Sequence, residues 1–565
     1  MLPFRISIVV LLIILLLSTD WDVQAKDLHP VATDTTETSH AHHHGEPGEL
    51  PSPFPDRVTL TWSDDPATTL SVTWRTDDSI ASSVAEIAVA TADPEFGSAA
   101  FSVEAETQPL DITGVEHENV AAHYHAATFS ELDPETLYAY RVGDGERWSE
   151  WFHARTAAAS DKPLSFIYFG DAQNDIRSRW SRAIRAAYQK APDASFMVHA
   201  GDLINRAHRN LEWGEWHEAG GFIQSMLPSL PVPGNHEYES TSTETVIDTF
   251  AVVAEHMDGA MEGMVMSSTP RLPIATFSAQ LEAATENPAD PVGTWQFTAG
   301  GTEGELTITG SAPSFQGQLV GPEDTELPVT SVTASGDSVT VEFLMEVDAG
   351  SSELSRHWRP GFTLPLNGAP GFDETTYYLD IQGVRIIGLD STPALSDPGA
   401  LQTQTEWLRR VLEENPSKWT VATFHHPIFS SSEGRDNLAT REAWKPLFDE
   451  YNVDLVLQGH DHTYARGIAQ NLAQGVNARS PMGGTVYVNS VSGPKMYNLK
   501  ADAWDAYEPI TLDKSAERTQ LFQVIQVDGD VLQFHAYTVT GDEFDAFELQ
   551  KAEAGEPATF RLLSE

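Results

Sequence analysis

The chain has 565 residues, of which 33 are Lys or Arg and 83 are Asp or Glu, so its formal charge is −50. Such an acidic surface repels nucleic acids and anionic membranes, which argues against both as partners. Cysteine is absent, which excludes disulfides, thiolate metal sites and cysteine nucleophiles. Any metal ion must therefore be held by His, Asp, Glu, Asn, Gln or Tyr.

Residues 1–25 predict a secretory signal peptide, because an apolar segment follows Arg5 and the sequence VQA ends at Ala25. An uncleaved membrane anchor is the alternative, but the apolar segment is shorter than the ~20 residues that span a bilayer. Residues 26–50 are polar and predict a disordered linker, whose HAHHH tract could bind a metal adventitiously. We expect a secreted or periplasmic protein without stable membrane association after cleavage.

Residues 51–158 alternate apolar and polar side chains in short runs separated by turn residues, as at Leu70, Val72 and Trp74. Alternation with period two predicts strands with one buried face, so this segment is expected to form a β-sandwich. It contains no evident chemistry.

Beyond residue 162 the pattern changes to continuous apolar runs that end in polar residues, such as LSFIYFGD, SFMVHAGD and VDLVLQGH. Strands buried on both faces have this pattern, and helical stretches such as that around Trp407 lie between them. We therefore expect an α/β catalytic domain from residues 162–265 and 354–545. Residues 266–353 return to alternation, as in DSVTVEFLMEV, and predict an inserted small β domain.

The polar residues at the ends of the apolar runs are the candidate site. They are Asp171, Gln173, Asp202, Asn235, His236, His425, His460 and His462. Any one of them alone is better explained as a turn residue or a helix cap. Functional groups gather at the carboxyl ends of strands in open α/β sheets, so the whole set predicts a metal site.

Carboxylates and imidazoles suit Fe, Zn, Mn and similar ions, and one carboxylate can bridge two of them. In an extended segment, side chains at positions i and i+2 face the same way. His460 and His462 are therefore expected to reach different ions of a pair ~3.5–4 Å apart, with Gly459 allowing a tight turn beside them.

The series GD, GD, GNHE, FHHP and GHDH resembles the metallophosphoesterase superfamily. With a β-sandwich in front, it resembles the purple acid phosphatases and their secreted bacterial relatives over residues 51–262 and 354–540. The resemblance implies an α/β/β/α catalytic sandwich behind a fibronectin type III-like domain. It also implies an acid phosphatase-like hydrolase with two metal ions.

The metal ligands that the resemblance implies are Asp171, Asp202, Asn235, His425, His460 and His462. Asp171 and His462 would bind the first ion, Asp202 would bridge, and the other three would hold the second ion. His236 would contact the phosphoryl oxygens or protonate the leaving group, while a metal-bound hydroxide attacks phosphorus.

The sequence departs from the family at the first ion. Purple acid phosphatases have GDxxY, whose tyrosinate binds ferric iron and gives the colour, but the fifth position here is Asn205. Other metallophosphoesterases have a histidine where this chain has Gln173. Gln173 or Asn205 could take the missing ligand's place, or water could fill it, and no purple colour is expected.

Four further residues are ambiguous. His426 is expected beside the ligands or at the substrate, and His199 is expected to be a buried, hydrogen-bonded histidine. Arg359 could contact phosphate or form a structural ion pair, and Tyr464 could line the pocket.

The leading hypothesis is a phosphomonoesterase that acts on small phosphoesters. A phosphodiesterase or nucleotidase on the same scaffold is the nearest alternative. A non-catalytic binding protein is less favoured, because the ligand set is present. The sequence does not indicate whether the protein is a monomer or an oligomer.

Overall fold

The computed structural model describes residues 50–563 except 113–119, 241–244, 258–259, 268–272, 283–290, 300–301, 322–324, 336, 349–351, 433–434, 470–483, 501, 506, 508–509 and 552. The predicted signal peptide and all but the last residue of the predicted linker lie outside these residues. Within the described part of the chain, no helix is both long enough and apolar enough to cross a membrane.

The N-terminal domain is the predicted β-sandwich, built from two four-stranded antiparallel sheets. One sheet has the order β1 (Asp56–Thr61), β2 (Leu70–Asp77), β6 (Ala122–Phe129), β5 (Glu106–Pro109). The other has the order β4 (Phe101–Glu104), β3 (Val84–Val89), β7 (Leu137–Gly143), β8 (Phe152–Arg155), with the short helix η1 (Phe96–Ala99) before β4. Leu60, Trp74 and Tyr140 are fully buried in its core.

The polar face of the sandwich contacts the catalytic domain. The alternating pattern had predicted only that this face is polar, not that it has a partner. Thr61 and Thr73 donate hydrogen bonds of 2.7 Å to the carbonyls of Thr363 and Gly361 in the catalytic domain. Both threonines are buried although they alternate with core residues. The two domains therefore share a polar interface that a hydrophobic pattern does not reveal.

The catalytic domain contains two seven-stranded mixed sheets. The first has the order β11 (Ser229–Pro231), β10 (Phe196–His199), β9 (Leu164–Phe169), β30 (Leu521–Asp528), β31 (Val531–Thr538), β32 (Glu543–Gln550), β33 (Thr559–Leu562). The second has the order β23 (Tyr377–Ile381), β24 (Val384–Gly388), β25 (Trp419–Thr423), β26 (Leu455–Gln458), β28 (Thr485–Asn489), β27 (Tyr464–Ala469), β29 (Lys514–Ala516). Side chains of both sheets meet in one apolar cluster.

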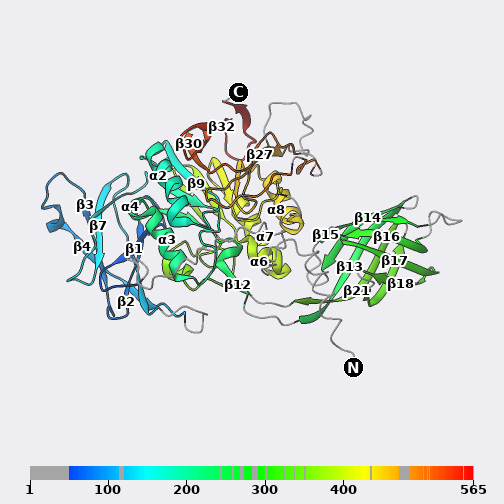
Figure 1. The fold of residues 1–565 in the computed structure, drawn as a ribbon. Coiled ribbons are helices and arrows are strands. Elements are labelled where there is room, and N and C mark those ends of the chain that lie inside the picture. Colours follow the sequence, from blue (N-terminus) through cyan, green and yellow to red (C-terminus); the bar gives the residue numbers. More distant parts are fainter. Residues whose placement is uncertain are drawn as a thin grey trace, which may run out of the picture.

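Helices cover the outer faces of these sheets and complete the α/β/β/α sandwich (Figure 1). Beside the first sheet lie η2 (Ile176–Trp180), α2 (Ser181–Lys190), α3 (Asn210–Gly220) and α4 (Phe222–Met226). Beside the second lie α6 (Ser391–Ser396), α7 (Pro398–Glu413) and α8 (Leu438–Glu450), while α5 (Trp358–Gly361) packs near the β-sandwich. The predicted apolar face of α7, including Trp407 and Leu408, is buried.

The insertion is a nine-stranded antiparallel sheet that stands to one side of the catalytic domain (Figure 1). Its strands are β13 (Thr245–Met257), β14 (Ala260–Ser267), β15 (Pro273–Leu281), β16 (Gly293–Ala299), β17 (Thr302–Ser311), β18 (Ser314–Val320), β19 (Glu326–Leu327), β20 (Val329–Ser335) and β21 (Ser338–Asp348). The chain leaves and returns through a two-stranded ribbon, in which β12 (Tyr238–Ser240) pairs with β22 (Ser352–Leu354).

Two of the expected boundaries differ from the structure. The inserted sheet begins at Thr245, so β13 and most of β14 belong to it and not to the catalytic domain. In β13, the buried Phe250 and Val252 lie on one face, and the apolar Ala251 and Val253 lie on the other. Because both faces are apolar here, the sequence shows no alternation. The catalytic domain also continues past residue 545, because β33 closes its first sheet.

Candidate metal centre

The candidate site lies where the carboxyl ends of parallel strands from both sheets meet. In the first sheet, β9, β10 and β11 run parallel and lead to Asp171, Asp202 and Asn235. In the second sheet, the parallel neighbours β25 and β26 lead to His425 and to His460 with His462. The topology therefore brings together residues that are up to 291 positions apart, from 171 to 462.

One group of ligand atoms comprises Asp171, Asp202 and His462, whose atoms lie within 4.8 Å of one another. The His462 Nε2 atom is 3.2 Å from Asp171 Oδ2. This Asp171 oxygen is buried and has no hydrogen-bond partner among the described residues. A buried carboxylate oxygen without a donor is costly unless a cation faces it.

A second group contains His425, His426 and His460. The Asn235 Oδ1 atom lies 3.0 Å from both His425 Nε2 and His460 Nδ1, and these two nitrogens are 3.1 Å apart. Three atoms that each offer a lone pair therefore converge on one point. A proton can satisfy one such contact, whereas a metal ion satisfies all three.

Asp202 lies between the two groups. Its Oδ2 atom is 3.2 Å from His425 Nε2, and its Oδ1 atom accepts a 3.0 Å hydrogen bond from the backbone N–H of His236. Since Asp202 also belongs to the first group, its carboxylate can reach an ion in either place.

Backbone carbonyls fix which nitrogen of each ring faces the centre. His425 Nδ1 lies 2.9 Å from the carbonyl of Ala200, and His462 Nδ1 lies 2.8 Å from the carbonyl of Lys495. Only an N–H can bond to a carbonyl, so Nδ1 is the protonated atom and Nε2 offers its lone pair inward.

Burial also prepares the groups for a cation. It lowers the pKa of His460 and His462 well below the ordinary value, so both rings stay neutral. It raises the pKa of Asp171 to about 7, and the nearby carboxylate of Asp202 adds to this effect. Burial lowers the pKa of His425, but the carboxylates of Asp202 and Asp171 outweigh it and raise that pKa to about 9, so a metal ion would have to displace the proton from Nε2 before that atom could bind it. The donor set therefore fits metal ions.

The backbone at the site is strained, which the sequence did not indicate. Asp202, His460 and His462 have φ values of 51°, 76° and 51°, in the left-handed region that such residues rarely adopt. The segment is thus not extended, and the argument from side-chain alternation was wrong. His460 and His462 still join different groups, because two left-handed residues turn the chain between them.

The backbone at position 459 passes so close to Asp171 that only glycine fits there. A Cβ atom at this position would lie 2.3 Å from Asp171 Oδ1. The absence of a side chain lets the GHDH segment sit against the first ligand, whose Oδ1 accepts a 2.7 Å bond from the His460 N–H.

Two buried acids hold the ligand loops, and sequence reasoning gave neither a role. Glu237 accepts hydrogen bonds from the backbone N–H groups of Asp202, Leu203, Ile204 and Gly234 at 2.7–3.3 Å. Asp461 binds the loop after β25 through the N–H groups of Ser431 and Ser432. The signal was available, since GNHE and GHDH contain these acids, but their partners depend on the fold.

His236 stands at the more open side of the centre. Its Nδ1 atom lies 2.7 Å from the carbonyl of Asn205, so Nε2 points to the site, 4.0 Å from Asp202 Oδ2. Its side chain is 16% exposed, against 1% for Asp202. Asn205 therefore orients His236 through its backbone carbonyl.

Gln173 lies beside the first group but turns its amide nitrogen toward it. Gln173 Nε2 donates to Asp202 Oδ2 at 2.7 Å and lies 3.2 Å from His462 Nε2. Its oxygen instead accepts a 3.4 Å contact from the ammonium of Lys495. An amide nitrogen offers no lone pair to a metal, so in this orientation Gln173 is not a ligand.

Of the remaining candidates, only His426 belongs to one of the two groups of ligand atoms. His426 lies against the second group, its ring 4.2 Å from that of His460, and its Nδ1 atom contacts Ser391 Oγ at 2.9 Å. Arg359 donates to the carbonyl of Asp373 and pairs with Glu374, which agrees with the structural ion pair.

Tyr464 and His199 differ from what the sequence suggested, the first fully and the second in part. Tyr464 does not line a pocket, because it is fully buried and its hydroxyl donates to Asp545 at 2.8 Å. His199 is buried as expected, but neither ring nitrogen has a hydrogen-bond partner among the described residues. Its ring packs against Phe169 and Trp216, and burial lowers its pKa to about 3.

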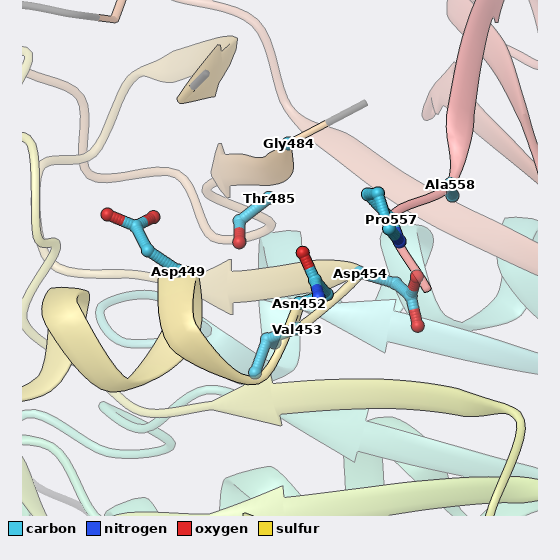
Figure 2. A pocket seen from close by; sticks show the side chains of 8 residues that line it. All are labelled: Asp449, Asn452, Val453, Asp454, Gly484, Thr485, Pro557 and Ala558. Atoms are coloured by element: carbon cyan, nitrogen blue, oxygen red, sulfur yellow. The ribbon is translucent and has the colours of Figure 1, made fainter. Parts of the chain in front are cut away.

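A small cavity at the opposite, amino end of β26 is not a second site of this kind (Figure 2). Asp449, Asn452 and Asp454 line it, and Asp454 is already paired with the buried Lys551 at 2.6 Å. Its volume of about 10 Å³ holds roughly one water molecule. It is therefore too small for a phosphoester.

Comparison with known proteins matches two family descriptions to this chain. Residues 55–156 match "Purple acid Phosphatase, N-terminal domain", and residues 346–464 match "Calcineurin-like phosphoesterase". In both segments the chain is similar to purple acid phosphatase-like metallophosphoesterases.

The curated relatives of this chain are distant. An uncharacterised protein of Mycobacterium tuberculosis is 23% identical over 436 residues, which cover 74% of this chain and 63% of that protein. A probable purple acid phosphatase of Arabidopsis thaliana is 27% identical over 29% of this chain and 37% of its own. The acid phosphatase type 7 of Mus musculus is 27% identical over 34% of this chain and 42% of its own. The chain thus spans less than two thirds of its mycobacterial relative.

Solved structures agree on the fold. A purple acid phosphatase from yellow lupin seeds superimposes with a TM-score of 0.56 at 15% identity, covering 91% of this chain and 78% of that one. A structure described as PhoD gives a TM-score of 0.52 at 11% identity, covering 91% and 93%. These values support the α/β/β/α architecture with its N-terminal β domain.

The protein is expected to be colourless when loaded with iron. Asn205 stands where the GDxxY motif of purple acid phosphatases has its tyrosinate, so that particular phenolate is missing. An absorption spectrum of the iron-loaded protein tests this, with Asn205→Tyr as the variant expected to gain a visible band. A strong visible band in the unaltered protein would contradict the expectation.

Proposed function

We propose that this metallophosphoesterase is a binuclear-metal phosphatase that hydrolyses phosphomonoesters. The observation that carries the proposal is the position of Asp202 between two groups of converging ligand atoms. Asp171, Asp202 and His462 would hold one ion, and Asn235, His425 and His460 would hold the other. Fe, Zn, Mn or similar ions suit these ligands.

When bound, the two ions would supply Lewis acidity to the phosphoryl group and activate the attacking water. The chain's own contribution is orientation and proton transfer. Asp202 and the fixed tautomers of His425 and His462 preset the ligand directions. His236 presents Nε2 to the open side, where it can donate to a phosphoryl oxygen or to the leaving group.

We further infer that the protein acts outside the cytoplasm on a small phosphoester, without a nucleic-acid partner. The apolar N-terminal segment and its VQA site support secretion. The acidic surface is compatible with an anionic substrate, because bound cations dominate the local field and remote charges are screened beyond ~8 Å.

The test is hydrolysis of a chromogenic phosphomonoester and of the matching bis-ester by purified protein of known metal content. We expect monoester turnover with two metal ions per chain. Faster turnover of the bis-ester would replace the proposal with a phosphodiesterase, and two metal ions without turnover of either ester would favour a binding protein. Absence of both metal and activity would refute the proposed site.

A further inference from the structure

A lysine stands at the first-ion side of the site, in the loop that follows β28. The sequence there reads SGPKMY, and β28 runs parallel to β26, so its carboxyl end reaches the same edge of the sheet. The backbone carbonyl of Lys495 holds His462 Nδ1 at 2.8 Å, while its ammonium lies 3.4 Å from Gln173 Oε1. The backbone of Lys495 thus orients His462, while its side chain contacts Gln173.

The ammonium determines how Gln173 is oriented. A lysine ammonium has three donors and no acceptor, so it requires the oxygen end of the amide. The amide nitrogen is then directed to Asp202 and His462, as observed. Lys495 is therefore one side chain away from the carboxylate that lies between the two ligand groups.

No carboxylate is in salt-bridge contact with Lys495 within the part of the chain that the structure describes. That is notable in a chain with 83 acidic residues and only 33 Lys and Arg. Its polar contact is the neutral amide of Gln173, and the ring of Tyr497 lies 5.5 Å from its ammonium. A half-buried ammonium with only a neutral partner is ready for an anionic ligand.

We propose that Lys495, with Gln173 as its positioning residue, binds a terminal phosphoryl oxygen and so selects phosphomonoesters over phosphodiesters. The physical reason is charge. A monoester carries a charge of about −1.5 to −2 at pH 7 and has three terminal oxygens, whereas a diester carries one negative charge and has two. An additional fixed cation therefore stabilises the bound monoester more. This inference rests on the proposed function and adds its substrate class.

The experiment compares the unaltered protein with Lys495→Met and with Lys500→Met, an exposed lysine on the same loop. Methionine leaves the backbone carbonyl that holds His462 in place. We expect kcat/KM for an aryl phosphomonoester to fall about 10- to 100-fold in Lys495→Met, as for loss of one charge-assisted hydrogen bond. The bis-ester should change much less, and Lys500→Met should match the unaltered protein.

A second readout does not depend on turnover. Binding of inorganic phosphate to the metal-loaded proteins, measured by calorimetry, should weaken by a similar factor in Lys495→Met at unchanged metal content. Equal phosphate affinity in variant and parent, or equal losses for both esters, would overturn the inference. Failure of the proposed function would appear separately, as absence of monoester turnover in the unaltered protein.

Discussion

Replacing Asp202 by alanine is expected to abolish hydrolysis and to lower the metal content at both positions. The carboxylate lies 3.2 Å from His425 Nε2 and shares the other ligand group with Asp171 and His462. Its loss leaves each group one anionic ligand short, so we expect turnover to fall by about 10³-fold or more. Steady-state kinetics together with elemental analysis of the purified protein measure both effects.

Two further variants sharpen this prediction. Asp202→Asn keeps the size of the side chain and an acceptor for the His236 N–H, but it removes the negative charge. It should therefore lose metal and activity while keeping the fold. Asp193→Ala alters an exposed aspartate and should behave as the unaltered protein. Full activity of Asp202→Ala with both metals bound would show that this carboxylate has no bridging role.

The second large effect is expected from Glu237→Ala. Glu237 is fully buried, and its carboxylate accepts four backbone hydrogen bonds from the loops that carry Asp202 and Asn235. Each buried N–H left without an acceptor costs about 1–3 kcal/mol. Even with water filling part of the space, we expect the free energy of unfolding to fall by at least about 3 kcal/mol, as measured by chemical denaturation.

Two further variants serve as controls for Glu237→Ala. Glu237→Gln keeps one oxygen but turns an NH₂ group toward two of the four donors, so its stability should lie between those of Glu237→Ala and the unaltered protein. Glu239→Ala changes an exposed residue two positions further and should have little effect. If Glu237→Ala unfolds at the same denaturant concentration as the unaltered protein, water replaces the carboxylate fully.

The strand ends made the main ligands predictable from sequence. Asp171, Asp202 and His425 each follow a continuous apolar run, and parallel strands place such residues at a common edge. The inserted domain was found for the same reason, since alternating strands differ in pattern from the buried strands around them. Its first strand was missed because both faces of β13 are apolar near Val252 and Val253.

Other features depend on contacts that no local pattern encodes. The left-handed backbone at His460 and His462 and the close approach of Gly459 to Asp171 are two such features. The role of Glu237 depends on where four N–H groups from two loops meet. Lys495 lies in the loop after β28, six residues beyond the end of that strand, and an isolated lysine in a loop carries no metal-binding pattern that a sequence could reveal.

The ribbon of β12 and β22 has a consequence for the history of such genes. Tyr238 pairs with Leu354 and Ser240 with Ser352, so the chain departs and returns at neighbouring points. Antiparallel partners lie ~4.5–5.5 Å apart, a gap that a two-residue turn closes. DNA that encodes a different module could therefore be exchanged between the codons for Ser240 and Ser352 by recombination, without changing the order of a single catalytic strand.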